Sequence, residues 1–371
     1  MNVMTKSFYK NTPNNIINSC LSNSILRDYK AANFHSTLAE YNPTPLIKLK
    51  ELSRKHKVGN IYVKDESFRF GLNAFKALGA SFAVHQSLKT SPETDTFCTA
   101  TDGNHGRALA WSAKKAGKKS FVFVPKETTS ERIKLIESEG AKVVQINGDY
   151  DKACKEAEKT AKLNNWTLIQ DTAWEGYTEI PAYIMSGYLT MFEEIEESLD
   201  SEIDVVFLQA GVGSMAAAGV FHYLHRFGKQ RPKIVIVEPE QADGILYSFK
   251  NDKLLTSKGN STTIMAGLNC STPSLSAWDL LKNGTDYSIK ISDSFAKKAI
   301  RELYFPMGSD KRIISGESGS AGYAGFLAIL EKNDLKSLRD DLKIDKNSNL
   351  LFLNTEGDTD KQVFQKIINN E

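Results

Sequence analysis

The sequence is poor in cysteine, nearly neutral overall and without long apolar runs, and each feature excludes a class of protein. Its 371 residues include four scattered cysteines with no CxxC or framework spacing, unlike a disulfide-stapled secreted domain. A net charge of +2 provides no overall field for nucleic acid. No apolar run approaches the roughly 18–20 residues that cross a bilayer, and the Asn-rich N-terminus lacks the apolar centre of a signal peptide. We therefore expect a cytoplasmic protein with no nucleic-acid or membrane partner.

The pattern of strands and helices predicts an α/β fold. Apolar residues make up 41% of the chain, enough for a sizeable core. Val, Ile and Leu dominate residues 202–211, 233–240 and 349–357, which is typical of strands buried on both faces of a parallel sheet. Strand and helix signals also alternate earlier, so we expect two doubly wound lobes with largely parallel sheets. The earlier strand candidates are residues 60–66, 96–101, 120–125, 142–147 and 166–171.

We expect two domains. Residues 85–185 would form a small sheet, and residues 1–84 and 186–371 would form a larger one. The first forty residues are interpreted as an N-terminal arm that packs on a partner subunit. The cleft between the two sheets is then the natural ligand site.

A glycine-rich turn follows the strand at 202–211, in the stretch VVFLQAGVGSMAAAG (205–219). Gly211 and Gly213 allow the backbone to turn tightly, and the amides at the start of the next helix favour an anion such as phosphate. The spelling G-x-G-x-x-A also matches a dinucleotide-binding fingerprint, with Glu238 ending the next strand as a ribose-binding acid would. A plain strand–helix turn is the third interpretation.

A second strand–turn–helix junction lies in TATDGNHGRALAW (99–111). Asp102, Gly103, Asn104, His105 and Gly106 form its tip. A helix cap requires only one Asp or Asn and one glycine, so the turn has more polar groups than capping requires. A structural turn and a binding site are both consistent with it.

Lys76 is an isolated cation in an Ala- and Gly-rich helical run. It follows Asn73, a good N-cap, by three residues, so it should lie near the positive end of a helix. Apolar neighbours would desolvate it, and both effects lower the pKa of the amine and make it nucleophilic, as a Schiff-base lysine requires. A surface lysine with a solvated ammonium is the alternative.

Together the three motifs resemble the tryptophan-synthase-type, or fold type II, pyridoxal-phosphate enzymes, which include threonine synthase and the serine/threonine dehydratases. The resemblance implies that pyridoxal 5′-phosphate is bound as a Schiff base to Lys76 and contacted at its 3′-oxygen by Asn104. It assigns the cofactor phosphate to the glycine turn and makes the small sheet the mobile lobe. The dinucleotide interpretation explains neither Lys76 nor Asn104. The phosphate-binding residues implied are Gly211, Val212, Gly213, Ser214 and Met215.

Seven sequence blocks narrow the resemblance to the diaminopropionate ammonia-lyases. This implies a homodimeric lyase that converts 2,3-diaminopropionate, as the D-isomer, the L-isomer or both, to pyruvate and two molecules of ammonia. A serine/threonine dehydratase and a non-catalytic binding protein on the same scaffold are the competing hypotheses. The blocks are KDESFRFGLNAFKALGAS, TATDGNHGRALAW, IQDTAWEGYTEIP, QAGVGSMAA, TIMAGLNC, ISGESGSAG and NTEGDTD.

The resemblance also implies roles for two acids and a hydroxyl. Asp102, where the dehydratases have a serine, would pair with the substrate β-ammonium and take a proton from the D-isomer, and Asp171, with Lys76, would serve the L-isomer. Thr355 is expected at the pyridine nitrogen, with Asn354 as the competing position. Other expected pocket residues are Glu317 and Ser318 on the cofactor side and Trp174, Tyr177 and Thr178 on the substrate side; no metal site is expected.

Overall fold

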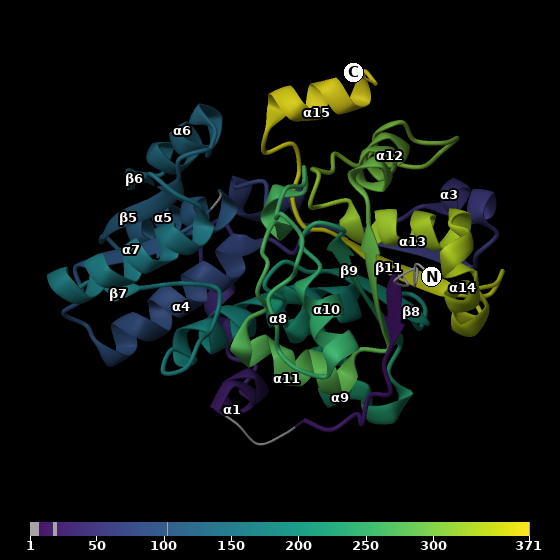
Figure 1. The fold of residues 1–371 in the computed structure, drawn as a ribbon, viewed down its shortest axis with the longest axis horizontal. Coiled ribbons are helices and arrows are strands. Elements are labelled where there is room, and N and C mark those ends of the chain that lie inside the picture. Colours follow the sequence, from purple (N-terminus) through teal and green to yellow (C-terminus); the bar gives the residue numbers. More distant parts are fainter. Residues whose placement is uncertain (1–6, 18–20, 102, 371) are drawn as a thin grey trace.

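The structure is a computed structural model that describes residues 7–17, 21–101 and 103–370. Its strands form two sheets, as the sequence pattern predicts (Figure 1). The larger sheet has the order β1 (Phe8–Lys10), β10 (Tyr287–Ile291), β9 (Lys233–Pro239), β8 (Val205–Gln209), β11 (Asn349–Asn354), β3 (Asn60–Asp65) and β2 (Leu46–Lys48). The smaller has the order β6 (Lys142–Ile146), β5 (Lys119–Pro125), β4 (Thr96–Ala100) and β7 (Thr167–Leu168).

The sheets are largely parallel, which confirms the predicted fold class. All pairs inside both sheets are parallel, and only the edge strands β1 and β2 of the larger sheet run antiparallel. Helices connect the strands: α1 (Leu21–Arg27), α2 (Ala31–His35), α3 (Lys50–His56), α4 (Lys76–Thr90), α5 (Asn104–Lys115), α6 (Ser130–Ser138), α7 (Tyr150–Asn164), α8 (Glu179–Ser198), α9 (Ser214–Phe227), α10 (Gly244–Asn251), α11 (Leu275–Gly284), α12 (Asp293–Tyr304), α13 (Ala321–Glu331), α14 (Lys336–Leu342) and α15 (Lys361–Ile368).

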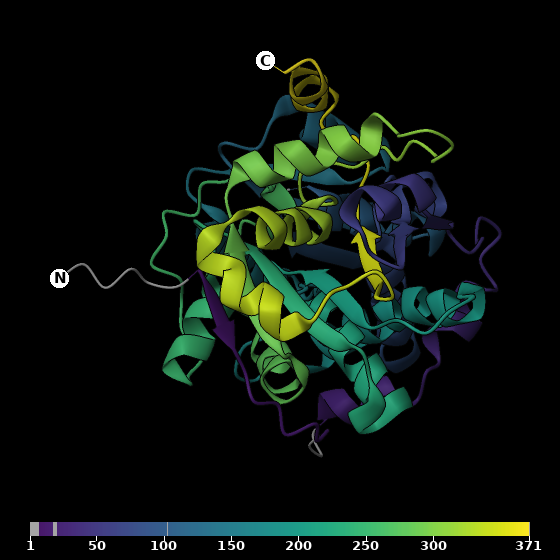
Figure 2. The ribbon, with the colours of Figure 1, turned by 90° about the vertical axis from the view of Figure 1, so that its right-hand side faces the viewer.

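Alternate side chains of the large sheet enter two different helical layers. Val206 and Leu208 of β8 pack with helices α4, α8 and α9, whereas Val205 and Phe207 pack with α3, α12, α13 and α14. Figure 2 shows α13 and α14 in front of the sheet on the second side. The small sheet is covered in the same way, by α7 on one face and by α5 and α6 on the other. Burial on both faces explains why β8, β9 and β11 of the large sheet read as continuous apolar runs.

Strand β7 is shorter than predicted for residues 166–171, because a side chain takes over its pairing. The Gln170 side chain accepts a hydrogen bond from the Ala100 amide (2.9 Å) and donates one to the Ala100 carbonyl (3.0 Å). The Gln170 backbone therefore does not pair with β4. The next residue, Asp171, can then turn away from the sheet.

The described part of the N-terminal arm packs on its own chain. Strand β1 pairs with β10, and the Asn11 side chain donates to the carbonyls of Lys282 and Thr285, both at 2.8 Å. Contacts with a partner subunit, which are expected from the sequence for this arm, stay a prediction. The predicted domain boundaries fall inside the continuous helices α4 and α8 and stay a prediction. Among the helices of the described residues, none has the length and apolarity needed to cross a bilayer.

Candidate active site

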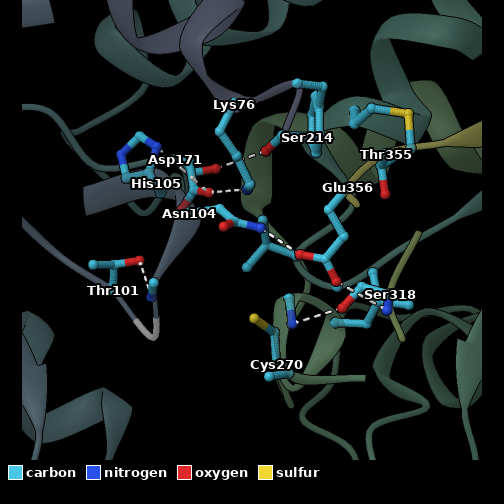
Figure 3. A pocket seen from close by; sticks show the side chains of 18 of the residues that line it. Lys76, Thr101, Asn104, His105, Asp171, Ser214, Cys270, Ser318, Thr355 and Glu356 are labelled. Carbon is cyan, nitrogen blue, oxygen red and sulfur yellow. Dashed lines mark hydrogen bonds and ion pairs between the residues drawn. The ribbon is translucent and has the colours of Figure 1, made fainter. Parts of the chain in front are cut away.

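A pocket with about 920 Å³ of empty space, its open mouth included, lies between segments of the two sheets. It is built at the carboxyl ends of β4, β7, β8 and β11, where ligand sites of parallel α/β sheets form. Figure 3 shows its side chains converging from both sides. Asp102 lies outside the described residues. All other residues predicted for catalysis or cofactor binding line the pocket: Lys76, Asn104, Asp171, Gly211, Val212, Gly213, Ser214, Met215 and Thr355.

Lys76 is the first residue of helix α4, but Asn73 is not the N-cap. Asn73 has a positive φ of 61°, and its side chain donates to Asp358 at 3.1 Å instead of to the helix. The segment before Lys76 is held by the loop after β11, where the Phe75 amide donates to the Thr355 carbonyl (3.1 Å). The position of Lys76 at a helix start is confirmed, and its cause is a contact between distant segments.

Lys76 forms an ion pair with Asp171, with 2.5 Å between Nζ and Oδ2. Burial is the largest single influence and lowers the pKa of Lys76. The charge and hydrogen bond of Asp171, with smaller contributions from Tyr188 and Cys270, together raise that pKa by more, so the net change is upward. The predicted decrease is therefore wrong, because the prediction lacked this carboxylate. Burial likewise raises the pKa of Asp171, but the Lys76 ammonium lowers it to about 2. Both partners are charged at neutral pH.

Asp171 is held from both sheets. The Ser214 hydroxyl at the start of α9 donates to the Asp171 carbonyl (2.7 Å). On the other side, the His105 ring lies 4.0 Å from the Asp171 carboxylate, and its Nε2 donates to the Ile169 carbonyl at 2.8 Å. Burial lowers the pKa of His105, so the ring is neutral and its Nε2 carries the proton. His105 thus supports the segment that places Asp171.

The glycine turn has the conformation of an anion cradle. Gly213 caps α9 with a φ of 92°, in the left-handed region that favours glycine, and a Cβ there would lie 2.9 Å from a Leu281 methyl group. No acidic residue lies in the first turn of α9. Backbone amides at a helix start without a competing carboxylate are suited to a phosphate. A buried amine and a phosphate cradle in one pocket are the donor set that pyridoxal 5′-phosphate requires.

Of the two candidates for the residue at the pyridine nitrogen, the geometry favours Thr355 over Asn354. Thr355 lines the pocket, and its hydroxyl accepts a hydrogen bond from Gln209 at 3.1 Å. The Asn354 side chain donates instead to Asp65 (2.7 Å) and to the Ile314 carbonyl (3.0 Å). It does not belong to the pocket lining.

Four of the other expected residues do not line the pocket: Glu317, Trp174, Tyr177 and Thr178. Tyr177 is structural, because its hydroxyl bonds the Gln170 amide (2.9 Å) and the Leu168 carbonyl (2.8 Å). Ser318 does line it, and its hydroxyl accepts from the Gly267 amide at 2.9 Å. Sequence reasoning assigned no role to the lining residues Arg132, Tyr150 and Glu356, since a single polar residue carries no local signal.

The dinucleotide interpretation finds no support in the geometry. Glu238 is fully buried and accepts hydrogen bonds from the amides of Ile245 and Leu246, both at 2.7 Å, so it anchors α10 and is closed to a ribose. His222 is buried beside Glu196 at 2.9 Å. Within the described ranges, no three side chains of metal-binding type come together.

Comparison with known proteins identifies the family. The family model for pyridoxal-phosphate dependent enzymes matches residues 38–343. Diaminopropionate ammonia-lyase from Escherichia coli (strain K12) is 38% identical over 359 residues, which cover 91% of this chain and 90% of that one. A crystal structure of the Escherichia coli enzyme in complex with an aminoacrylate–PLP azomethine reaction intermediate matches with a TM-score of 0.91 and 37% identity, over 97% of this chain and 96% of that chain.

A threonine dehydratase is a more distant relative. The biosynthetic L-threonine dehydratase of Haemophilus influenzae is 27% identical over 295 residues, covering 79% of this chain and 54% of its own. The Escherichia coli lyase is similar over a longer stretch and at higher identity.

Proposed function

The chain belongs to the pyridoxal-phosphate dependent enzymes and, within them, to the diaminopropionate ammonia-lyases, and from this membership we propose that it converts 2,3-diaminopropionate to pyruvate and two molecules of ammonia. The observation that carries the proposal is the Lys76–Asp171 ion pair beside the glycine turn. Lys76, Asp171 and the glycine turn line one pocket, which supports an amine nucleophile, a proton acceptor and a phosphate site acting together. Diaminopropionate ammonia-lyases are lyases, and pyridoxal phosphate is the cofactor of the family.

The residues of the pocket suit this cofactor. Lys76 would hold it covalently, Asn104 would contact its 3′-oxygen, and Thr355 would lie at its ring nitrogen. The turn Gly211–Met215 would bind its phosphate. When bound, pyridoxal phosphate supplies an electron sink for the negative charge that develops at the substrate Cα after its proton leaves.

The Lys76–Asp171 pair moves a proton within the site. The Lys76 amine is protonated when paired, so it must lose a proton from Nζ before it can act as a nucleophile. Asp171 Oδ2, at 2.5 Å, is the acceptor within reach. Asp171, with Lys76, is the proposed base for the Cα proton of the L-isomer. Asp102 would serve the D-isomer from the opposite face.

Selectivity for a diamino acid requires a carboxylate near the substrate β-amino group. Asp102 is the proposed partner, since it directly precedes the Gly103–Asn104 turn at the pocket. A carboxylate stabilises a second ammonium by a charge-assisted hydrogen bond, whereas the serine of the dehydratases offers only a neutral hydroxyl. Diaminopropionate would therefore be preferred over serine and threonine.

We further propose that the protein is a cytoplasmic homodimer with a mobile lobe formed by residues 85–185. The three cysteines among the described residues, Cys98, Cys154 and Cys270, form no disulfide, as is usual for proteins of a reducing compartment. Light scattering after size exclusion tests the dimer, for which a mass of twice 41.3 kDa is expected.

The assay that tests the function measures pyruvate and ammonia from D- and L-diaminopropionate. Two ammonia molecules per pyruvate are expected, because both amino groups leave the substrate. Lys76→Arg keeps the positive charge beside Asp171 but removes the nucleophilic amine, so it is the matched inactive control. One ammonia per 2-oxo acid, with serine (giving pyruvate) and threonine (giving 2-oxobutyrate) as the preferred substrates, would instead identify a dehydratase.

A further inference from the structure

Glu356 is a buried carboxylate in the pocket wall that the proposed chemistry does not use. Glu356 directly follows Thr355 in the sequence and is 5% exposed. Three donors from three segments reach it: the Asn104 side-chain amide, the Ser318 backbone amide at 3.0 Å and the Thr359 hydroxyl at 3.4 Å. Figure 3 shows Asn104 and Ser318 on opposite sides of this carboxylate. All three groups donate, so the carboxylate is satisfied as an acceptor.

The glycines of the block ISGESGSAG leave the space that Glu356 occupies. A Cβ on Gly316 would lie 3.0 Å from the Glu356 Cγ, and a Cβ on Gly319 would lie 2.4 Å from the Glu356 carbonyl. The Gly316 amide also donates to that carbonyl at 2.9 Å. The surrounding backbone is thus fitted closely around this one residue.

Glu356 connects the segments that carry Lys76 and Asn104. Its backbone pairs with Ala74, two residues before Lys76. Its side chain binds Asn104, the first residue of α5, which packs on the small sheet. A substitution of Glu356 therefore alters contacts on both sides of the pocket.

An asparagine side chain can present either its oxygen or its nitrogen, and the partners decide which. A carboxylate only accepts hydrogen bonds, so beside Glu356 the Asn104 amide must turn its nitrogen, Nδ2, toward Oε2. Nδ2 carries two hydrogens, and the bond to Glu356 uses one of them. The second remains for a ligand in the pocket that Asn104 lines.

We propose that Glu356 is a positioning residue that fixes the orientation of the Asn104 amide, so that Asn104 presents a hydrogen-bond donor to the cofactor. This inference rests on the proposed function, because it requires pyridoxal phosphate at Lys76. Glu356→Gln tests it. Glutamine has the same size, but its amide can donate as well as accept a hydrogen bond. The Asn104 amide can then face it with either its oxygen or its nitrogen.

The readouts are the visible absorption maximum of the bound cofactor and its dissociation constant, measured on the holoenzyme. Glu356→Gln should shift the absorption maximum and weaken cofactor binding about tenfold, the usual effect of losing a hydrogen bond to a charged group. Asp360→Asn is the matched control: it removes a carboxylate four residues further along that caps α15 by accepting from the Val363 amide, and asparagine caps helices equally well. Its absorption maximum and dissociation constant should equal those of the wild type.

A double-mutant cycle decides whether Glu356 acts through Asn104. Once Asn104→Ala has removed the amide, Glu356→Gln should cause no further change in absorption or in cofactor affinity. Independent, additive effects would overturn the proposal, as would Glu356→Gln with a wild-type spectrum and affinity. If Glu356→Gln does not fold, Glu356→Ala in the same two backgrounds gives the same comparison. A wild-type protein that binds no pyridoxal phosphate would overturn the proposed function itself.

Discussion

Lys76 Nζ and Asp171 Oδ2 lie 2.5 Å apart, at the junction between a helix that starts beside the large sheet and a segment that leaves the small one. The ion pair keeps the lysine charged and the aspartate ionised, with a pKa of about 2 for Asp171. The pair joins the proposed nucleophile to its proposed proton acceptor. It also makes the chemistry sensitive to how the segments from the two sheets meet.

Asp171→Asn should impair the reaction of L-diaminopropionate by about 10²–10⁴-fold in kcat/KM, the range for loss of a general base. Removing the carboxylate removes the main influence that raises the pKa of Lys76, so burial lowers that pKa relative to the wild type. Steady-state pyruvate release from each isomer measures the effect. Asp95→Asn, which removes an exposed carboxylate paired with Lys119, should leave both isomers unaffected. Unchanged turnover of the L-isomer by Asp171→Asn would exclude Asp171 as the base.

Asp102→Asn should damage the reaction of D-diaminopropionate selectively. The amide keeps the shape of the side chain but cannot take a proton, and only the D-isomer is proposed to lose its Cα proton to Asp102. Weaker pairing with the β-ammonium affects both isomers alike, so the loss should be larger for the D-isomer. The ratio of kcat/KM for the two isomers is the measurement. An equal loss on both isomers would contradict the assignment of opposite faces.

Gly213→Ala should destabilise the protein and weaken cofactor binding together. The left-handed backbone costs about 1–2 kcal/mol for any residue with a Cβ, and the new methyl group would press on Leu281 at 2.9 Å. Gly228→Ala separates the two effects, since Gly228 ends the same helix with a φ of 55° and has no neighbour within 4 Å. Gly228→Ala should lower the unfolding free energy, measured by urea denaturation, without altering cofactor affinity. Equal cofactor affinity in Gly213→Ala would contradict the role of the turn as a phosphate cradle.

Glu317→Gln should stabilise the protein at alkaline pH. Burial raises the pKa of Glu317 to about 7, with a further contribution from the charge of Glu356. Because the folded-state pKa exceeds the unfolded one, the stability from the protonated carboxyl is fully present below about pH 4.5 and is lost as the pH rises through 7. The variant has no such dependence, so its unfolding free energy relative to the wild type should increase by about 2–3 kcal/mol between pH 4.5 and pH 8. Urea denaturation at both pH values measures this difference, and a constant difference would show that Glu317 does not titrate in this range.

Much of the architecture could be predicted because its signals are local. The runs of Val, Ile and Leu that became β8, β9 and β11 are buried on both faces, and burial alone determines such composition. The glycine turn was equally recognisable, because a positive φ at Gly213 requires glycine. The family resemblance carried by the motifs placed Lys76, Asn104 and the turn in one site, and the structure brings them together in one pocket.

The errors concern contacts between residues far apart in the sequence. Asparagine is a residue type favoured at the N-cap, but the Asn73 side chain donates a hydrogen bond to Asp358 instead. Nothing near Asn73 in the sequence indicates that partner. The pKa of Lys76 was predicted with the wrong sign because Asp171 is not a sequence neighbour. The hydrogen bonds of Glu356 with Asn104 and Ser318 also join residues far apart in the sequence, so no local pattern predicts them.

The ratio of kcat/KM for L-diaminopropionate to that for L-serine tests the central claim most directly. Both substrates have the same carbon skeleton, and they differ in the group that leaves from the β-carbon. The carboxylates proposed for the site, Asp102 and Asp171, predict a clear preference for the diamino acid, with two ammonia molecules released per pyruvate. A preference for serine, with one ammonia per pyruvate, would contradict the account and identify the protein as a dehydratase.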